Sequence, residues 1–271
     1  RRALVFTVAL ALGLALGLAL LAGCRREGPI PEPTQGSWLD SREVLSVAFH
    51  PRREGAGISS APHAALDIPV ADGVTLGARF YAAAPADPTV LFFHGNGEIA
   101  ADYDQIAPLF VGLGASFLPV DYRGYGRSTG RPTMSAMLTD ARTVFVWTRA
   151  WLSAQQRRQT VIVMGRSLGS APALEIAAAY PAETAGLIID SGFADAAVLM
   201  ARLGARLPAA PPPDALLRQE EKIAAYAGPT LIIHGTDDRI IPVADAEALF
   251  RASGSRTKRL LRIPGAGHND L

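Results

Sequence analysis

The chain has 271 residues and a formal net charge of +1, which gives no sign of the basic surface that nucleic-acid binding requires. Its single cysteine excludes an intramolecular disulfide. The sequence has neither a phosphate-binding P-loop motif nor a helical zinc-protease motif, and no cluster of His, Cys and carboxylates has metal-site spacing. We therefore predict no metal and no cofactor.

The N-terminus predicts a targeting segment over residues 1–24. Arg1 and Arg2 precede twenty uncharged residues in which only Thr7 is polar. Leu-Ala-Gly-Cys at residues 21–24 then resembles a bacterial lipobox, in which the cysteine is lipidated and becomes the mature N-terminus. A retained transmembrane helix is the alternative, because twenty apolar residues can span about 30 Å. Either reading predicts a membrane anchor, and the lipobox reading places a lipid on Cys24. We expect the globular domain outside the cytoplasm, in the cell envelope.

Residues 25–37 predict a linker, since prolines alternate at positions 29, 31 and 33. Residues 38–271 are long enough for one α/β domain. Within it, a hairpin is predicted across Asp72 and Gly73. Continuous apolar runs predict strands at 89–93, 116–120, 160–164, 186–189, 230–233 and 258–263. Helical patterns lie between them at 99–112, 134–154, 170–180 and 243–253.

This alternation predicts an α/β fold with a mostly parallel central sheet covered by helices on both faces. Ligands of such sheets bind at the carboxyl ends of the strands. Between the strands at 186–189 and 230–233 lies a cap insertion, about 192–228. Leu199, Leu203 and Leu207 recur there at helical spacing, which indicates either a short apolar lid or an ordinary helix packed on the sheet. As a lid, it would line an acyl pocket with Phe193, Leu199 and Leu203.

The most informative motif is Gly-Arg-Ser-Leu-Gly at residues 165–169, which joins a predicted strand to a predicted helix. A sharp turn of this kind exposes the hydroxyl of Ser167 at a helix N-terminus. Glycines two residues before and after the serine fit a turn that has no room for Cβ atoms. Ser167 is therefore the predicted nucleophile.

A serine nucleophile needs a base, which is nearly always histidine. His94 and His234 each end a strand and precede glycine, which favours a structural role, and His50 and His63 precede the core strands. His268, in a glycine-rich loop after the last strand, is the predicted base.

The base in turn needs an orienting carboxylate, and three aspartates compete for that role. Asp237 and Asp238 follow the strand at 230–233, and Asp190 ends the strand before it.

The predicted oxyanion hole uses two backbone N–H groups. One belongs to Leu168, directly after the nucleophile. The other belongs to Asn96 in the loop His-Gly-Asn-Gly at residues 94–97, where two glycines let the backbone approach closely.

Together these segments resemble the α/β-hydrolase superfamily, and most closely the compact serine hydrolases that include membrane-anchored esterases and depalmitoylases. The segments that carry the resemblance are 94–97, 121–128, 165–169, 234–242 and 267–268. The spacing His-Gly-x-x-Asp followed by an apolar pair and proline favours Asp238 as the acid, and leaves Asp237 as a turn or helix-cap residue. Some members place the acid where Asp190 lies. The resemblance also implies a final helix after the base, which we expect to be missing from this sequence.

The sequence thus predicts a membrane-tethered serine hydrolase that cleaves a small-molecule carboxylic ester or thioester through an acyl-enzyme at Ser167. A serine peptidase or amidase with the same triad is an alternative, because the catalytic residues are shared. A non-catalytic binding protein with the hydrolase fold is a third interpretation, which a missing triad member would favour. The sequence leaves the oligomeric state open.

Overall fold

The computed structural model describes residues 37–55, 61–206 and 217–270. The predicted leader with Cys24, nearly all of the predicted linker, and Leu207 in the predicted cap lie outside the described residues. Within the described ranges, no helix combines the length and the apolar character needed to cross a bilayer.

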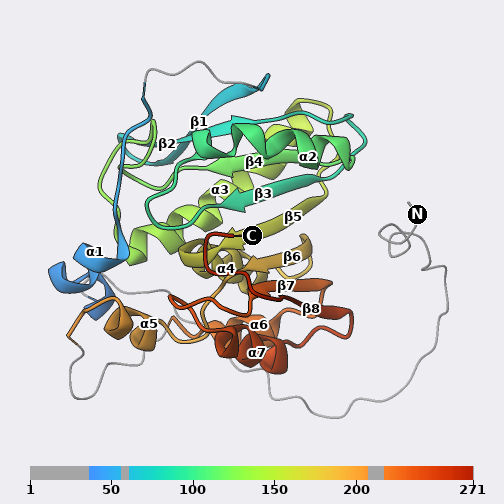
Figure 1. Cartoon of the computed structure of the whole chain (residues 1–271). Coiled ribbons are helices and arrows are strands. Elements are labelled where there is room, and N and C mark those ends of the chain that lie inside the picture. Colours follow the sequence, from blue (N-terminus) through green and yellow to red (C-terminus); the bar gives the residue numbers. More distant parts are fainter. Residues whose placement is uncertain (1–36, 56–60, 207–216, 271) are drawn as a thin grey trace, which may run out of the picture. The chain divides into compact units, whose positions relative to one another are not determined.

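One eight-stranded sheet organises the domain, in the order β1-β2-β4-β3-β5-β6-β7-β8 (Figure 1). The strands are β1 (Ala64–Ala71), β2 (Val74–Phe80), β3 (Thr89–Phe93), β4 (Ser116–Val120), β5 (Val161–Arg166), β6 (Thr184–Asp190), β7 (Thr230–Gly235) and β8 (Lys258–Ile263). The predicted hairpin forms the antiparallel edge β1–β2, and β3 to β8 pair in parallel. The apolar runs therefore predicted a mostly parallel sheet correctly.

Helices lie on both faces of the sheet. The longer ones are α3 (Met134–Ala154), α4 (Ser170–Ala179) and α7 (Val243–Ala252), and the shorter ones are α1 (Arg42–Ala48), α2 (Ala107–Gly112), α5 (Ala196–Arg202) and α6 (Gln219–Ala225). Helices α3, α4, α6 and α7 contact one another in that order and form one layer. Alternation along β3 separates the two faces, because Leu91 and Phe93 belong to the large core, whereas Val90 and Phe92 join a smaller cluster with Ala107 of α2.

The helix predicted over residues 99–112 is instead two elements. A 3-10 helix η2 (Ala100–Gln105) comes first, and Ile106 is both its C-cap and the N-cap of α2. Pro108 lies in the first turn of α2, where the N–H that proline lacks would have no partner within the helix. In the interior of a continuous helix over 99–112, the same proline would break the hydrogen-bond pattern. The sequence pattern also did not predict α1, α6 or the 3-10 helix η1 (Trp38–Asp40).

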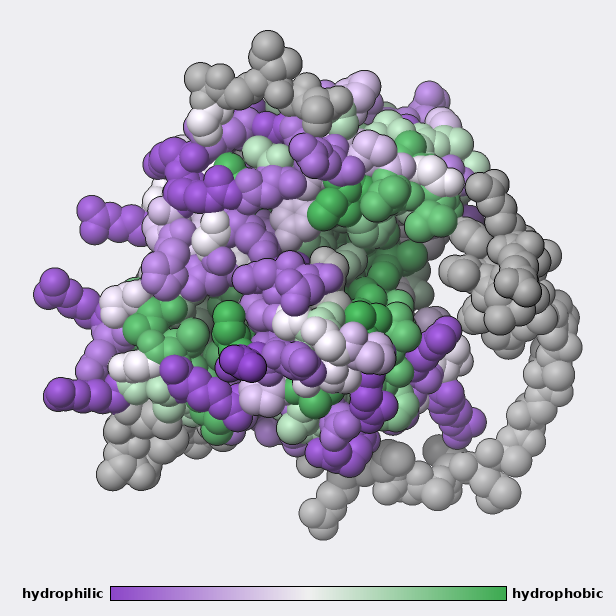
Figure 2. All heavy atoms as spheres, viewed as in Figure 1, coloured by the Kyte–Doolittle hydropathy of each residue, from purple (hydrophilic) through white to green (hydrophobic). Residues whose placement is uncertain are grey.

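One face of the sheet is less completely covered over the described residues of β5 to β7. Ile162, Met164, Ile188 and Ile233 are only half-buried there. A cavity of about 630 Å³ lies there, lined in part by Phe110, Met164 and Ile263. Figure 2 shows this hollow as apolar side chains between α2 and the strands β7 and β8.

Candidate active site

Ser167 lies at the tight turn between β5 and α4. Its φ of +53° is in the left-handed region, which a residue with a side chain adopts only under local constraint. A Cβ on Gly165 would collide with the backbone oxygen of Gly169, and a Cβ on Gly169 would collide with that of Phe93. The two glycines therefore allow the chain to cross itself closely enough to present the serine hydroxyl.

Three side chains from three loops form one hydrogen-bonded series at this turn. The Ser167 hydroxyl donates to Nε2 of His268 at 2.9 Å. Nδ1 of His268 donates to Oδ2 of Asp238 at 2.7 Å. Because a carboxylate only accepts, Asp238 selects the tautomer in which Nε2 is free to accept the serine proton.

Asp238 is held in its ionised form. Its Oδ1 accepts hydrogen bonds from the backbone N–H groups of Ile240 and Ile241, both at 2.9 Å. Burial opposes ionisation, but the hydrogen bonds from His234, His268 and the backbone outweigh it and keep the pKa of Asp238 well below its usual range. The carboxylate is therefore available to accept from the imidazole at neutral pH.

The loop at residues 94–97 borders the same space as Ser167. Asn96 and Leu168 line a cavity of about 190 Å³ together with Ser167 and His268. The Asn96 side chain is fixed from outside, because its Oδ1 accepts from the backbone N–H of His50 at 2.7 Å. Asn96 Nδ2 also donates to Nδ1 of His50 at 2.8 Å. The loop is thus anchored to the segment that follows α1.

The fold and the site can now be compared with known proteins. A family model described as "Serine aminopeptidase, S33" matches residues 84–218 and 213–271. The chain belongs to this α/β-hydrolase family. Membership confirms the predicted α/β-hydrolase fold and the predicted enzyme class, since the family consists of hydrolases.

The α/β-hydrolase has similar relatives in bacteria and animals. It is 34% identical over 207 residues to an uncharacterized protein of Mycobacterium tuberculosis (strain ATCC 25618 / H37Rv), covering 73% of this chain and 70% of that protein. It is 33% identical over 198 residues to the alpha/beta hydrolase domain-containing protein 17B of Homo sapiens, covering 68% of this chain and 61% of the human protein.

Solved structures share the fold at lower identity. The esterase Pf2001 of Pyrococcus furiosus aligns with a TM-score of 0.67 and 19% identity, over 82% of this chain and 91% of that chain. A monoacylglycerol lipase of Paleococcus ferrophilus aligns with a TM-score of 0.57 and 18% identity, over 72% and 90%. These likenesses show the α/β-hydrolase fold.

The two other candidate acids of the hydrolase bind elsewhere. Oδ1 of Asp237 accepts from the hydroxyl of Thr236 at 3.0 Å. Asp190 accepts from the hydroxyl of Ser191 at 2.9 Å and lies 3.7 Å from Nε of Arg166. Burial raises the pKa of Asp190, although the charge of Arg166 offsets part of this effect. Both ring nitrogens of His268 are already engaged with Ser167 and Asp238.

The two strand-end histidines are buried and bonded to backbone. Nδ1 of His94 donates to the carbonyl of Gly95 at 2.8 Å, and Nε2 of His234 donates to that of Ile241 at 2.7 Å. Neither side chain has any exposed surface. Each histidine fixes the loop that follows its own strand.

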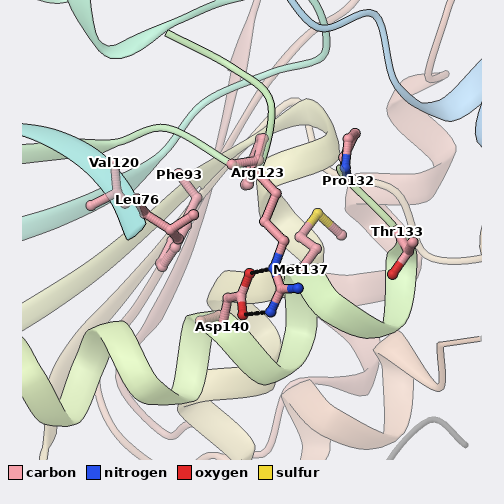
Figure 3. Close-up of a pocket in the computed structure, with 10 residues that line it drawn as sticks. Leu76, Phe93, Val120, Arg123, Pro132, Thr133, Met137 and Asp140 are labelled. Carbon is pink, nitrogen blue, oxygen red and sulfur yellow. Dashed lines mark hydrogen bonds and ion pairs between the residues drawn. The ribbon is translucent and has the colours of Figure 1, made fainter. Parts of the chain in front are cut away.

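The segment 121–128, for which the sequence offered no catalytic role, holds loops together. Arg123 donates two hydrogen bonds of 2.7 Å to Asp140 of α3 (Figure 3). The Tyr122 hydroxyl donates to the carbonyl of His94 at 2.6 Å, and Oδ1 of Asp121 accepts from the N–H of Ala100. These hydrogen bonds hold His94, at the start of the 94–97 loop, and Ala100, shortly after its end.

The cavity at Ser167 differs from the lining predicted by the sequence. Leu199 and Leu203 line it, but Phe193 is wholly buried within the core cluster and does not line the cavity. Met200 takes part in the lining instead. Charged residues also border the cavity, because Glu98 and Arg166 belong to its lining. Sequence reasoning missed both charged residues, and the only available signal was the position of Arg166 directly before Ser167.

Proposed function

We propose that the protein is a serine hydrolase that cleaves carboxylic esters or thioesters with small acyl groups, through an acyl-enzyme at Ser167. The observation that carries this proposal is the hydrogen-bonded series from Ser167 through His268 to Asp238. Such a series activates a hydroxyl for attack on a carbonyl carbon.

In the first half-reaction, the Ser167 oxygen attacks the carbonyl carbon while its proton moves to Nε2 of His268. The carbonyl π bond opens, and the oxyanion accepts hydrogen bonds from the N–H groups of Leu168 and Asn96. When the intermediate collapses, the bond to the leaving oxygen or sulfur breaks. That atom takes the proton from His268 and departs as an alcohol or thiol, which leaves the acyl group on Ser167.

In the second half-reaction, water attacks the acyl carbon and gives a proton to Nε2 of His268. Collapse releases the carboxylic acid and returns the proton to the Ser167 oxygen, so the enzyme is regenerated. Throughout, ionised Asp238 stabilises the transient imidazolium and holds its ring in place. No external oxidant, reductant or second substrate other than water is consumed.

The cavity supports a small acyl substrate. Its volume of about 190 Å³ is below the roughly 300 to 1,000 Å³ of pockets that enclose drug-sized ligands. Its apolar side is formed by Leu199, Met200 and Leu203. An aminopeptidase activity is the second candidate, because the matching family model is described by that activity.

Active-site labelling tests the proposal. A fluorophosphonate should label the wild-type protein, and the label should be absent from Ser167→Ala. Ser153→Ala is the matched control. Ser153 lies in the last turn of α3, and its replacement should leave labelling unchanged. Labelling that persists in Ser167→Ala would refute the assignment. Comparing p-nitrophenyl esters with aminoacyl anilides then separates the esterase proposal from the aminopeptidase alternative.

We further propose that the enzyme is held at the cell envelope by lipid on Cys24. The support is the sequence of residues 1–24 alone. Several acyl chains, at about 0.8 kcal/mol per buried CH₂, would give stable attachment. Mass spectrometry of the mature N-terminus should find an acylated Cys24, and Cys24→Ser should move activity out of the membrane fraction. An intact residue 1–22 segment in purified membranes would instead identify a transmembrane anchor.

A further inference from the structure

We propose that Arg166 is a positioning residue that fixes the loop carrying His268 and the 94–97 loop relative to each other through one guanidinium group. This inference rests on the proposed function of Ser167 and His268. Arg166 ends β5 directly before the predicted nucleophile, so its side chain starts from a central strand of the sheet next to the site.

The first set of contacts made by Arg166 holds the loop that carries His268. Nη2 of Arg166 donates to the backbone carbonyl of His268 at 2.8 Å and to the side-chain oxygen of Asn269 at 3.1 Å. The contact is therefore with the backbone of the predicted base itself. Because His268 sits in a glycine-rich loop, this tie restricts the position from which the imidazole meets Ser167.

The second set of contacts holds the 94–97 loop through Glu98. Nη1 of Arg166 forms an ion pair with Oε1 of Glu98. The other oxygen, Oε2, accepts from the N–H of Gly95 at 2.7 Å and from the Tyr103 hydroxyl at 2.5 Å. Glu98 thus links Arg166 to the Gly95 N–H, one residue before the peptide that carries the predicted Asn96 N–H donor.

The network formed by Arg166, Glu98 and Gly95 is largely buried and closely packed. The side chains of Arg166 and Glu98 are only 10% and 24% exposed. A Cβ on Gly95 would lie 3.0 Å from both Nη1 of Arg166 and Oε2 of Glu98. Asp190 adds a second carboxylate 3.7 Å from Nε. The guanidinium therefore serves partners in several directions, which matches the planar five-donor geometry of arginine and not the single ammonium of lysine.

Arg166→Lys is the decisive variant, because it keeps the positive charge but replaces the planar five-donor guanidinium with a single ammonium group. We expect kcat for p-nitrophenyl acetate to fall by about 10²-fold with KM little changed, since misplacement of catalytic groups by about 1 Å has that effect. Fluorophosphonate labelling should slow in parallel. Arg123→Lys is the matched control, because it disrupts the two-bond pair of Arg123 with Asp140, neither of which lines the cavity at Ser167.

Chemical rescue separates positioning from a general loss of folding. Millimolar guanidinium chloride should restore part of the activity of Arg166→Ala, whereas methylammonium chloride at equal ionic strength should not. Glu98→Gln provides a milder second variant, which should also lower kcat more than it alters KM. The melting temperature of each variant shows whether it is folded in the assay.

Two results would overturn the inference. One is a kcat for Arg166→Lys within about threefold of wild type, far from the 10²-fold expected of misplaced groups. The other is an equal loss of kcat in Arg123→Lys. Ser167→Ala in the same series distinguishes the two levels of the argument. If Ser167→Ala retains esterase activity, the proposed function fails. If it is inactive while Arg166→Lys is unimpaired, only the role of Arg166 fails.

Discussion

Nε2 of His234 lies 3.3 Å from Oδ2 of Asp238, the same oxygen that accepts from Nδ1 of His268. Two imidazoles therefore approach a single carboxylate oxygen, one fully buried and one facing Ser167. Nε2 of His234 also donates to the carbonyl of Ile241, whose own N–H donates to Asp238. His234 thus completes a small hydrogen-bonded network around the loop that carries Asp238, which we call the acid loop.

Replacing His234 should damage this loop and, through it, catalysis. His234→Phe keeps the approximate shape but leaves the buried carbonyl of Ile241 without its donor, which costs about 1–3 kcal/mol. We expect a lower free energy of unfolding in urea and a reduced kcat. His63→Phe is the control, because His63 is partly exposed and contacts Tyr81, away from the acid loop. Wild-type stability of His234→Phe would contradict the structural role.

Three asparagine variants identify the acid. Asp238→Asn keeps the size of the side chain but removes the acceptor that sets the His268 tautomer, and such a loss lowers kcat by about 10⁴. Asp237→Asn and Asp190→Asn should leave most of kcat intact, because their oxygens bond to Thr236 and Ser191. Steady-state kinetics on one ester substrate decides the matter. A deep loss in Asp190→Asn with a near-normal Asp238→Asn would transfer the role to Asp190.

The stability contribution of Asp238 should depend on pH in a defined direction. Its pKa in the folded protein is below the unfolded value of about 3.9. The contribution is therefore complete above the unfolded pKa and is lost as the pH falls through the folded pKa. The difference in unfolding free energy between wild type and Asp238→Asn should be largest near pH 7 and shrink below about pH 4. A constant difference from pH 7 to pH 3 would contradict the low pKa.

Local patterns in the sequence predicted the strands and the turn at Ser167 because both depend on neighbouring residues. The apolar run at 89–93 became β3 with the same bounds, and the run at 160–164 became β5 with its ends shifted. Glycines at 165 and 169 reported a close crossing of the backbone, which the positive φ of Ser167 bears out. The chemical roles of Ser167, His268 and Asp238 remain predictions that the variants above test.

Contacts between distant residues were not predictable in the same way. Arg166 and Glu98 are 68 residues apart, and His50 and Asn96 are 46 apart. Neither pair belongs to a periodic pattern, so only the folded chain brings them together. The same reason explains why Phe193 was wrongly placed in the pocket. Phe193 follows β6 after two residues, and no local pattern indicated whether its side chain faces the pocket or the core.

The glycine before the nucleophile should tolerate no side chain. Gly165→Ala would place a methyl group on the backbone oxygen of Gly169 and 2.8 Å from the Cβ of Ala173. Overpacking of this kind costs about 1–3 kcal/mol and would also displace Ser167. Gly186→Ala is the matched control, because its Cβ would lie 3.6 Å from Ile162, at an ordinary contact distance. Urea unfolding and kcat should both separate the two variants. Equal stability of both would mean that the turn relaxes easily.

The size of the cavity at Ser167 leads to a prediction about the acyl chain. Its apolar lining includes Leu199, Met200 and Leu203, and the paired charges of Glu98 and Arg166 also border it. A chain that outgrows the apolar side meets that polar border or leaves the cavity, so kcat/KM for p-nitrophenyl esters should peak at short or medium length. Discrimination should be gradual, because an apolar pocket separates substrates by only about 1–3 kcal/mol per methylene.

Enlarging the pocket should move that maximum. Met200→Ala removes volume from the apolar side without touching Ser167, His268 or Asp238, so longer esters should gain relative to acetate. Val198→Ala, on the same helix but 41% exposed and outside the cavity lining, is the control and should leave the profile unchanged. A wild-type maximum at sixteen carbons, or a profile that Met200→Ala does not shift, would mean that the acyl group binds elsewhere on the protein. In that case the apolar hollow beside α2 would be the next surface to test, because it is the larger of the two cavities.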